Sequence, residues 1–279
     1  MTVRKLLSLL LAVLMLCCVT AVSSCAQEQP LNYVLLGDSI AWGAGVYNSE
    51  AACYGKIVAD TNGYNYVNYA VNGHRTADLI ERLSRSEVAE AVKNADIISM
   101  SIGGNDYLQQ NLPKIFAQVA IGNYKIVDDV EEIFRENFDT IITTIRELNP
   151  DVTILAQTLY NPRVDLLRDF YDLAVVRINR SINGYLEEHP GAFEIVDVAS
   201  VLTKDHPEYI ALDSIHPSSL GNEEIAKLVL AKLNELGLGE ATEPVVRTVG
   251  IDQIPYAVRI FKLIKDFFLK IFGVFTVTV

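Results

Sequence analysis

The sequence predicts an α/β fold, a three-layer α/β/α sandwich built around a central parallel sheet. Short apolar runs that end in glycine or polar residues alternate with longer segments of helical periodicity. Strands covered by helices on both faces have continuous apolar sequences, as these runs do. The 279-residue chain is long enough to bury one sizeable core. We expect a single domain at residues 31–238, because no linker divides that stretch.

The predicted strands are the five short apolar runs. The first is uninterrupted and leads directly into Gly37-Asp38-Ser39, as expected of a strand buried on both faces. The second run ends in Asn-Gly and the third in Gly-Gly-Asn-Asp. Ligands of parallel sheets bind at the carboxyl ends of the strands, so the residues after these runs are candidates for chemistry. The expected strands are residues 33–36, 66–71, 97–102, 152–157 and 194–198.

The predicted helices are recognised by their apolar stripes and by their ends. In the third of them, apolar residues between Ile133 and Ile145 recur at helical spacing and would face the sheet. Asn149-Pro150 ends that helix, because a residue before proline disfavours the helical conformation. Pro217-Ser218-Ser219 offers a fixed φ and candidate caps for the last helix. The expected helices are residues 51–60, 76–83, 127–148, 165–188 and 219–236.

Ser39 directly follows the first predicted strand and is a candidate nucleophile. Asp38 and Ser39 are also good helix N-caps, so this stretch alone leaves both interpretations open. A serine hydroxyl needs a base, and histidine suits that task because its unperturbed pKa is ~6.5. The base in turn needs an acceptor on its other ring nitrogen. Asp213 lies three residues before His216, close enough in a tight turn to supply it.

Two further segments offer donors for a developing negative charge. Acyl transfer places that charge on a carbonyl oxygen, which backbone N–H groups and an asparagine amide can stabilise. Gly73 ends the second predicted strand with an unobstructed N–H, and Asn105 follows the third with a side-chain donor. Taken singly, Asn-Gly and Gly-Asn are only turn signals.

Together these residues resemble the SGNH hydrolases, also called the GDSL-like lipase/acylhydrolase family, which is named for Ser, Gly, Asn and His in four sequence blocks. The blocks are Gly37-Asp38-Ser39-Ile40, with Ile40 in place of leucine, Asn68 to Gly73, Gly103 to Asp106, and Asp213 to Pro217. The resemblance implies a flavodoxin-like sheet and ester hydrolysis that needs no cofactor and no metal. It implies Ser39 as nucleophile, His216 as base and Asp213 as its orienter. It also implies an oxyanion hole formed by the N–H groups of Ser39 and Gly73 and the Asn105 amide.

Other residues near these blocks are candidates for a substrate pocket. Trp42, just past the nucleophile, is either an apolar wall or core. Tyr160 and Asn161 follow the fourth predicted strand and either touch the substrate or only pack a loop. His74 follows Gly73 and would line the mouth, and the apolar segment 107–124 would be a lid or wall. The candidates for substrate contacts are Asp38, Trp42, His74, Tyr160 and Asn161.

The N-terminus predicts export. Residues 1–24 contain a short basic start and an apolar stretch too short for a comfortable membrane span, as in secretory signals. Residues 22–25 resemble a bacterial lipobox, which would make Cys25 the lipidated N-terminus. Ordinary cleavage near Ala26 and an uncleaved anchor are the alternatives. If Cys25 carries lipid, Cys53 is a lone thiol; if it does not, the two cysteines could pair. The absence of Cys-x-x-Cys from the mature chain and the scattered histidines predict no metal site.

The C-terminal residues 239–279 lie outside the predicted domain. A linker-like part precedes an expected helix at 256–275, whose charged residues share one face and give it a net positive charge. Such a helix either lies on an anionic membrane surface or packs against the domain or a partner chain. The whole chain has a net charge of -12, which argues against nucleic acid as a partner.

These observations favour an exported serine esterase or acylhydrolase, lipid-anchored at the outer face of a bacterial cell membrane or otherwise secreted. One alternative is an O-acetyl-carbohydrate esterase that acts on cell wall or other polysaccharide. A narrow pocket beside Trp42 would favour acetyl groups, whereas a long apolar groove under residues 112–121 would favour acyl chains. A different class of function, a non-catalytic surface binding protein on the same fold, is the third hypothesis.

Overall fold

The computed structural model describes residues 29–163, 168–246, 260 and 264. The chain divides into two units, residues 1–30 and 31–279, and all the described helices and strands belong to the second unit. The predicted signal segment, Cys25 and most of the predicted C-terminal helix lie outside the described residues. Of that helix only Ile260 and Ile264 are described, and both are helical.

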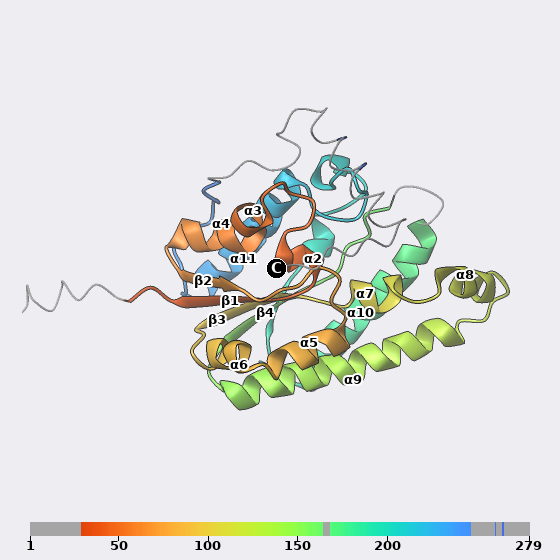
Figure 1. The fold of residues 1–279 in the computed structure, drawn as a ribbon, viewed down its shortest axis with the longest axis horizontal. Coiled ribbons are helices and arrows are strands. Elements are labelled where there is room, and N and C mark those ends of the chain that lie inside the picture. The colour runs from red at the N-terminus through yellow and green to blue at the C-terminus, as the bar shows by residue number, and fades with distance from the viewer. Residues whose placement is uncertain (1–28, 164–167, 247–259, 261–263, 265–279) are drawn as a thin grey trace, which may run out of the picture. The chain divides into compact units, whose positions relative to one another are not determined.

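The core of the unit is a five-stranded, all-parallel sheet with the strand order β2-β1-β3-β4-β5 (Figure 1). The α/β/α prediction is confirmed. The order reverses at β1, so the carboxyl ends of β1 and β3 flank the point where parallel sheets bind ligands. The strands are β1 (Asn32–Gly37), β2 (Asn65–Asn68), β3 (Ile97–Ser101), β4 (Thr153–Gln157) and β5 (Glu194–Val196).

Helices cover both faces of the sheet (Figure 1). Successive side chains of a strand point to opposite faces, so Val34 and Leu36 of β1 join one apolar core, and Tyr33 and Leu35 join the other. The first core is completed by α5 (Thr76–Leu83), α6 (Ser86–Lys93), α9 (Lys125–Leu148) and α10 (Arg168–Glu188), and the second by α4 (Tyr54–Asn62) and α11 (Ser219–Glu235).

Several predicted boundaries were wrong. The helix expected at 51–60 is two helices, α3 (Ser49–Ala52) and α4, because the buried Cys53 between them has an extended backbone with ψ 155°. Strand β2 ends at Asn68 rather than at residue 71, because the Asn68 side chain accepts the N–H of Ala70. The elements that were not predicted are α2 (Ser39–Trp42), α6, α7 (Gly104–Leu108), and the 3-10 turns η1 (Val198–Ser200) and η2 (Pro207–Tyr209). The segment expected to form a lid or wall contains α8 (Leu112–Ala120).

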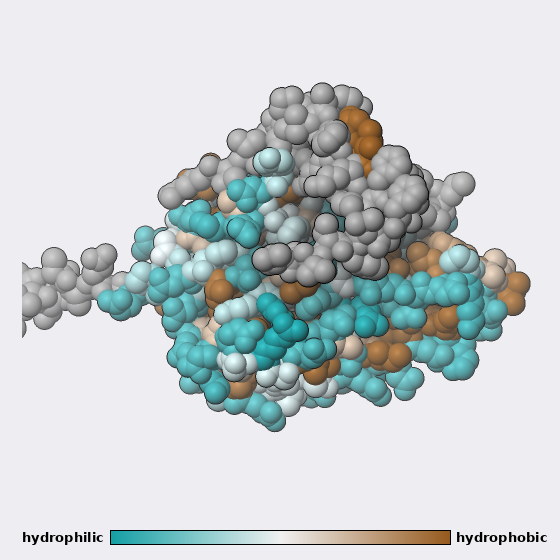
Figure 2. All heavy atoms as spheres, viewed as in Figure 1, coloured by the Kyte–Doolittle hydropathy of each residue, from teal (hydrophilic) through white to brown (hydrophobic). Residues whose placement is uncertain are grey.

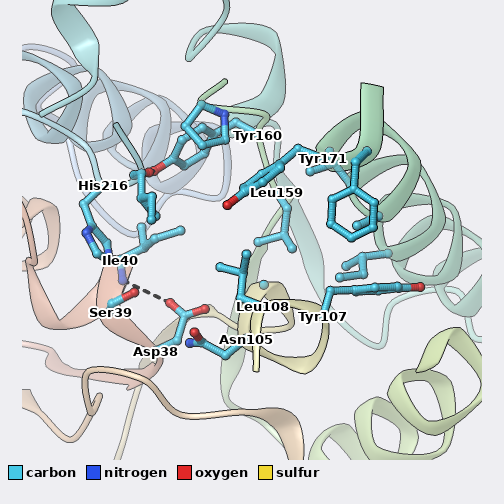
Figure 3. A pocket seen from close by; sticks show the side chains of 17 residues that line it. Asp38, Ser39, Ile40, Asn105, Tyr107, Leu108, Leu159, Tyr160, Tyr171 and His216 are labelled. Atoms are coloured by element: carbon cyan, nitrogen blue, oxygen red, sulfur yellow. Dashed lines mark hydrogen bonds between the residues drawn. The ribbon is translucent and has the colours of Figure 1, made fainter. Parts of the chain in front are cut away.

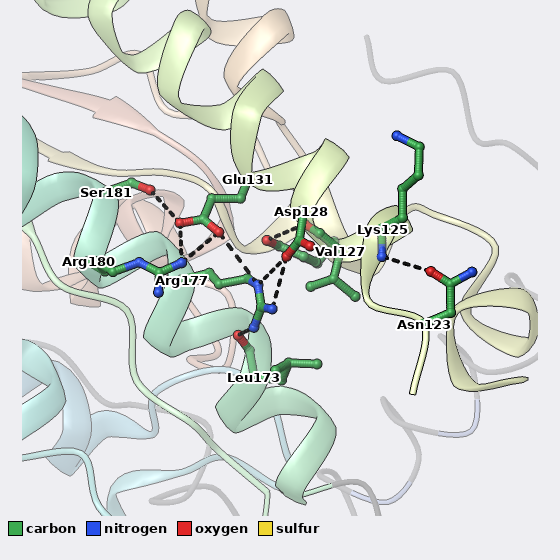
Figure 4. Close-up of polar contacts among 10 residues, drawn as sticks. Asn123, Lys125, Val127, Asp128, Glu131, Leu173, Arg177, Arg180 and Ser181 are labelled. Carbon is green, nitrogen blue, oxygen red and sulfur yellow. Dashed lines mark hydrogen bonds and ion pairs between the residues drawn. The ribbon is translucent and has the colours of Figure 1, made fainter. Parts of the chain in front are cut away.

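Ionic contacts join α9 to α10 (Figure 4). Glu131 of α9 accepts hydrogen bonds from Arg180 at 2.7 and 2.8 Å and from Ser181 at 3.3 Å. Arg177 pairs with Asp128 at 3.0 Å and with Glu131 at 3.5 Å. We call these five residues the α9–α10 charge cluster. Because the side chains of Glu131 and Arg177 are only 13% and 15% exposed, the cluster is a partly buried link and not a solvated surface pair.

The face of the molecule seen in Figure 2 is mainly hydrophilic. In Figure 2, hydrophilic residues dominate the surface in the region of α5, α6 and α9, with apolar residues scattered among them. Within the described ranges, no helix combines the length and the apolar character that crossing a membrane requires.

Candidate active site

Ser39 lies where β1 ends and α2 begins. Gly37 has φ +119°, and a Cβ at this position would lie 1.9 Å from the carbonyl oxygen of Ser101, so only glycine lets β1 turn this close to β3. The next N–H, that of Asp38, donates to the same Ser101 oxygen at 2.9 Å. Ser39 is therefore fixed at the carboxyl edge of the sheet, 8% exposed, as the first residue of α2.

Asp38 both caps α2 and contributes to the pocket. Its carboxylate accepts the N–H of Ile40 at 3.0 Å and the hydroxyl of Ser101 at 2.8 Å. The Ser101 hydroxyl in turn accepts the N–H of Ala41 at 3.0 Å. Burial raises the pKa of Asp38 to about 6, against the opposing effect of these hydrogen bonds and of His216 nearby. The two interpretations of Asp38-Ser39, cap and site, are thus compatible.

Asp213 and His216 form a hydrogen-bonded pair. Nδ1 of His216 lies 2.7 Å from Oδ2 of Asp213. Burial raises the pKa of Asp213, but the hydrogen bonds from His216 and Ile215 outweigh it, so the net pKa is lowered and the carboxylate is ionised at neutral pH. A carboxylate only accepts, so Nδ1 carries the proton and the lone pair is on Nε2. Figure 3 shows the His216 ring directed toward the side chain of Ser39.

The loop that carries this pair is tightly held. Oδ1 of Asp213 accepts the N–H groups of Ile215 and His216, each at 3.0 Å. Ser214 adopts the left-handed conformation with φ 60°, the one non-glycine residue in the described ranges that does so. The hydroxyl of Tyr160 donates to the Ile215 carbonyl at 2.7 Å. This Tyr160 contact links the histidine loop to the segment after β4.

The two predicted oxyanion donors come from different segments. Gly73 lies in the turn after β2 with φ +88°, a conformation that favours glycine. Asn105 lies in the first turn of α7, after β3, and its Nδ2 donates to the His74 carbonyl at 3.0 Å. An amide nitrogen has two hydrogens, so one N–H of Asn105 is left for a ligand. Within the described residues, the backbone N–H groups of Ser39 and Gly73 also have no hydrogen-bond acceptor.

A pocket with a volume of about 70 Å³ extends from these groups. Ser39, Asn105 and His216 border one end, and Tyr107 lies at the other, with Tyr171 between them (Figure 3). Most of the remaining wall is apolar, and a large part of it comes from α10. The apolar and aromatic lining residues are Ile40, Tyr107, Leu108, Leu159, Tyr160, Pro162, Phe170, Tyr171, Ala174, Val175, Ile178 and Ile215.

Of the residues predicted to contact substrate, Asp38 and Tyr160 line this pocket and three others do not. Trp42 ends α2 with its side chain 38% exposed, so it forms neither pocket wall nor core. His74 is not among the residues that line the pocket, and burial lowers its pKa. Asn161 instead donates to the Arg168 carbonyl at 2.9 Å and thereby holds the start of α10.

The prediction for residues 107–124 was half correct. Tyr107 and Leu108 form pocket wall, whereas α8 does not line the pocket and packs on α10, where the ring centroids of Phe116 and Phe170 lie 4.4 Å apart with the rings tilted by 52°. The α10 wall was missed, although its apolar residues recur at helical spacing. That spacing is equally typical of packing against a sheet, so it could not reveal the pocket. Ser101 was missed for a different reason, because nothing in its sequence context distinguishes it from core.

Metal-binding geometry is absent from the described ranges, since no three His, Cys, Asp or Glu side chains there are grouped to hold an ion. Cys53 is a fully buried free thiol, as expected of a small apolar side chain.

The fold and the arrangement of Ser39, Asn105 and the Asp213–His216 pair define a class of protein. The model of the GDSL-like Lipase/Acylhydrolase family matches residues 35–224. The chain belongs to this family and is an ester hydrolase, so the resemblance inferred from the four sequence blocks is confirmed.

Individual relatives agree with this assignment. The chain is 29% identical over 214 residues to the uncharacterized protein YpmR of Bacillus subtilis (strain 168), covering 73% of this chain and 81% of that protein. It is 28% identical over 225 residues to the spore germination lipase LipC of Bacillus licheniformis, covering 75% and 97%. The crystal structure of the lipase Lip_vut3 from a goat rumen metagenome has a similar fold, with a TM-score of 0.61, 22% identity, and coverage of 72% and 96%.

Proposed function

We propose that the protein is an exported serine esterase that hydrolyses carboxylic esters through an acyl-enzyme on Ser39. Nε2 of His216 takes the proton of the Ser39 hydroxyl as its oxygen attacks the ester carbonyl. Asp213 keeps the imidazole in the required tautomer and stabilises the imidazolium. The observation that carries this proposal is the Asp213–His216 pair directed at a serine beside an apolar pocket.

The tetrahedral intermediate carries its negative charge on the former carbonyl oxygen. The N–H groups of Ser39 and Gly73 and the free N–H of Asn105 are the donors proposed to stabilise it. His216 then donates its proton to the leaving alcohol, and the ester C–O bond breaks. Water repeats the sequence on the acyl-enzyme and releases the acid.

The pocket favours an acyl chain over an acetyl group as the part of the substrate that it holds. A cavity of about 70 Å³ has room for roughly five water-sized groups, more than one methyl needs. Its apolar wall stabilises methylenes by about 0.8 kcal/mol each. We therefore propose esters with short to medium apolar acyl groups as substrates. The same test decides the O-acetyl-carbohydrate esterase hypothesis, which predicts that the acetyl ester is hydrolysed fastest.

The test is hydrolysis of p-nitrophenyl esters from acetyl to palmitoyl by the chain that starts at Cys25. Ser39→Ala should lower kcat by about 10⁴-fold or more, as expected when a nucleophile is lost. Ser200→Ala, an exposed serine in η1, is the matched control and should be fully active. Turnover that survives Ser39→Ala would refute the mechanism. A rate that falls steadily from acetyl upward would refute the acyl-chain assignment.

Export and lipid anchoring at Cys25 are part of the same proposal. They are supported by the apolar signal-like segment and the small residues before Cys25. The full chain expressed in a bacterium should incorporate radiolabelled palmitate and partition into the detergent phase. Cys25→Ala should abolish both, with Cys53→Ala as the matched control. Labelling that persists in Cys25→Ala would rule out this anchor.

A further inference from the structure

We infer that Asp106 of α7 and Gln109, the C-cap residue of that helix, are positioning residues for the oxyanion hole. They hold the turn that carries Gly73 against the helix that carries Asn105, so that two donors on separate segments face one oxygen. The inference rests on the function proposed above.

The turn after β2 needs such support because few hydrogen bonds from the sheet hold it in place. Strand β2 is at the edge of the sheet and ends at Asn68, five residues before Gly73. The last backbone bonds to β1 come from Tyr69 and Val71, at 2.9 and 3.0 Å. Within the described residues, the hydrogen bonds that hold the segment 73–76 to the rest of the fold come mainly from α7 and its surroundings.

Two side chains of α7 and that of its C-cap residue, Gln109, contact this segment. Asn105 donates to the His74 carbonyl at 3.0 Å, and Gln109 donates to the Gly73 carbonyl. The carboxylate of Asp106 accepts the N–H of Thr76 at 3.1 Å and its hydroxyl at 2.5 Å. Positions 105, 106 and 109 lie on one side of a helical turn, so their side chains contact the segment 73–76 at successive points. We call these contacts the α7 clamp.

The Asp106 end of the clamp is buried and fully engaged. Asp106 is 5% exposed, and such a carboxylate is tolerated only when it is hydrogen-bonded. Asn137 of α9 donates to the Thr76 hydroxyl at 2.9 Å, which leaves the hydroxyl proton for Asp106. The Gln109 end is exposed, and its amide has the Gly73 carbonyl as its one hydrogen-bond partner in the described residues. Loss of that amide should therefore affect Gly73 without weakening the core.

Gln109→Met tests the exposed end, because methionine keeps the length of the side chain but cannot donate. Losing a hydrogen bond worth ~1 kcal/mol should lower kcat for a p-nitrophenyl ester about 3- to 10-fold, with KM nearly unchanged. Gln109→Lys retains a donor and should keep most of the wild-type kcat. The matched control is Gln110→Met, since the one hydrogen bond of the Gln110 amide in the described residues goes to the Asp106 carbonyl of α7, at 2.9 Å. The urea midpoint should be the same in all three variants.

Asp106→Asn tests the buried end with the same assay. It should lower kcat at nearly constant KM, whether or not the urea midpoint of unfolding also changes. A lower midpoint with unchanged kcat would make Asp106 a structural residue only. For Gln109, wild-type kcat in Gln109→Met, or an equal loss in Gln109→Lys, would overturn the inference. Failure of the proposed function is distinct, because it is measured by turnover that survives Ser39→Ala.

Discussion

Replacing Asp38 by asparagine should stabilise the folded protein above pH 6. The carboxylate is 2% exposed, and its ordinary pKa of 3.8 is raised to about 6, chiefly by burial. Asparagine keeps an acceptor for Ile40 and Ser101 without carrying the buried charge. Its amide nitrogen would replace Oδ2, which has no hydrogen-bond partner in the described residues.

The size and sign of the effect follow from the pKa difference between the folded and the unfolded chain. Below pH 3.8 the carboxyl is protonated in both states, and burial of the charge costs nothing. As pH rises to about 6, the unfolded chain loses its proton first, so the folded state is progressively destabilised. Because a tenfold change in an acid dissociation constant corresponds to about 1.4 kcal/mol, the full penalty above pH 6 is up to about 3 kcal/mol. For a domain of this size that is a change in Tm of about 6–12 °C.

Urea unfolding of wild type and Asp38→Asn at pH 3.5 and pH 8 measures this difference. The variant should gain stability at pH 8 relative to wild type, and the gain should vanish at pH 3.5. Asp213→Asn is the control of opposite sign, because the pKa of Asp213 is lowered and its charge stabilises the folded state above pH 4. Equal stability of Asp38→Asn and wild type at pH 8 would refute the assignment of a buried, costly carboxylate to Asp38.

Two other predictions concern α10. Phe170→Ala should shift the optimum of kcat/KM in the p-nitrophenyl ester series toward longer acyl chains, because Phe170 forms part of the pocket wall and packs against α8. An unchanged optimum would contradict this prediction. Glu131→Gln should lower the free energy of unfolding by about 2 kcal/mol, since Arg177 and Arg180 lose their shared carboxylate. Lys125→Gln, which breaks an exposed ion pair on the same helix as Glu131, is the control and should leave the urea midpoint unchanged. Equal midpoints in the two variants would show that the α9–α10 charge cluster stabilises the fold no more than an exposed pair does.

The sequence predicted the sheet well because strands buried on both faces give a strong local signal. All five predicted strands exist, with ends displaced by at most three residues. The Asp213–His216 pair was predictable for a similar reason, since both residues lie in one tight turn. Ser39 and Asn105 were located because each follows a strand whose end could be recognised.

Contacts between distant segments were not predictable in this way. Ser101, Asp106 and Gln109 each bond a group at least thirty residues away, and no spacing in the sequence identifies such a partner. Trp42 illustrates the converse error. It lies near the nucleophile in the sequence, but Ile40 and Trp42 leave the short helix α2 in different directions, and only Ile40 reaches the pocket.

The proposed catalytic residues and the far wall of the pocket lie on different elements of this fold. Ser39, Gly73 and Asn105 follow the ends of β1, β2 and β3. The far wall of the pocket is one face of α10, and Asn179 of this helix exchanges two hydrogen bonds of 2.8 Å with the backbone of Leu159 after β4. Because the far wall belongs to a helix and not to the strand ends, we expect substitutions along α10 to reshape the pocket while the proposed nucleophile and oxyanion donors stay in place. Acyl preference can therefore change without loss of the hydrolytic machinery.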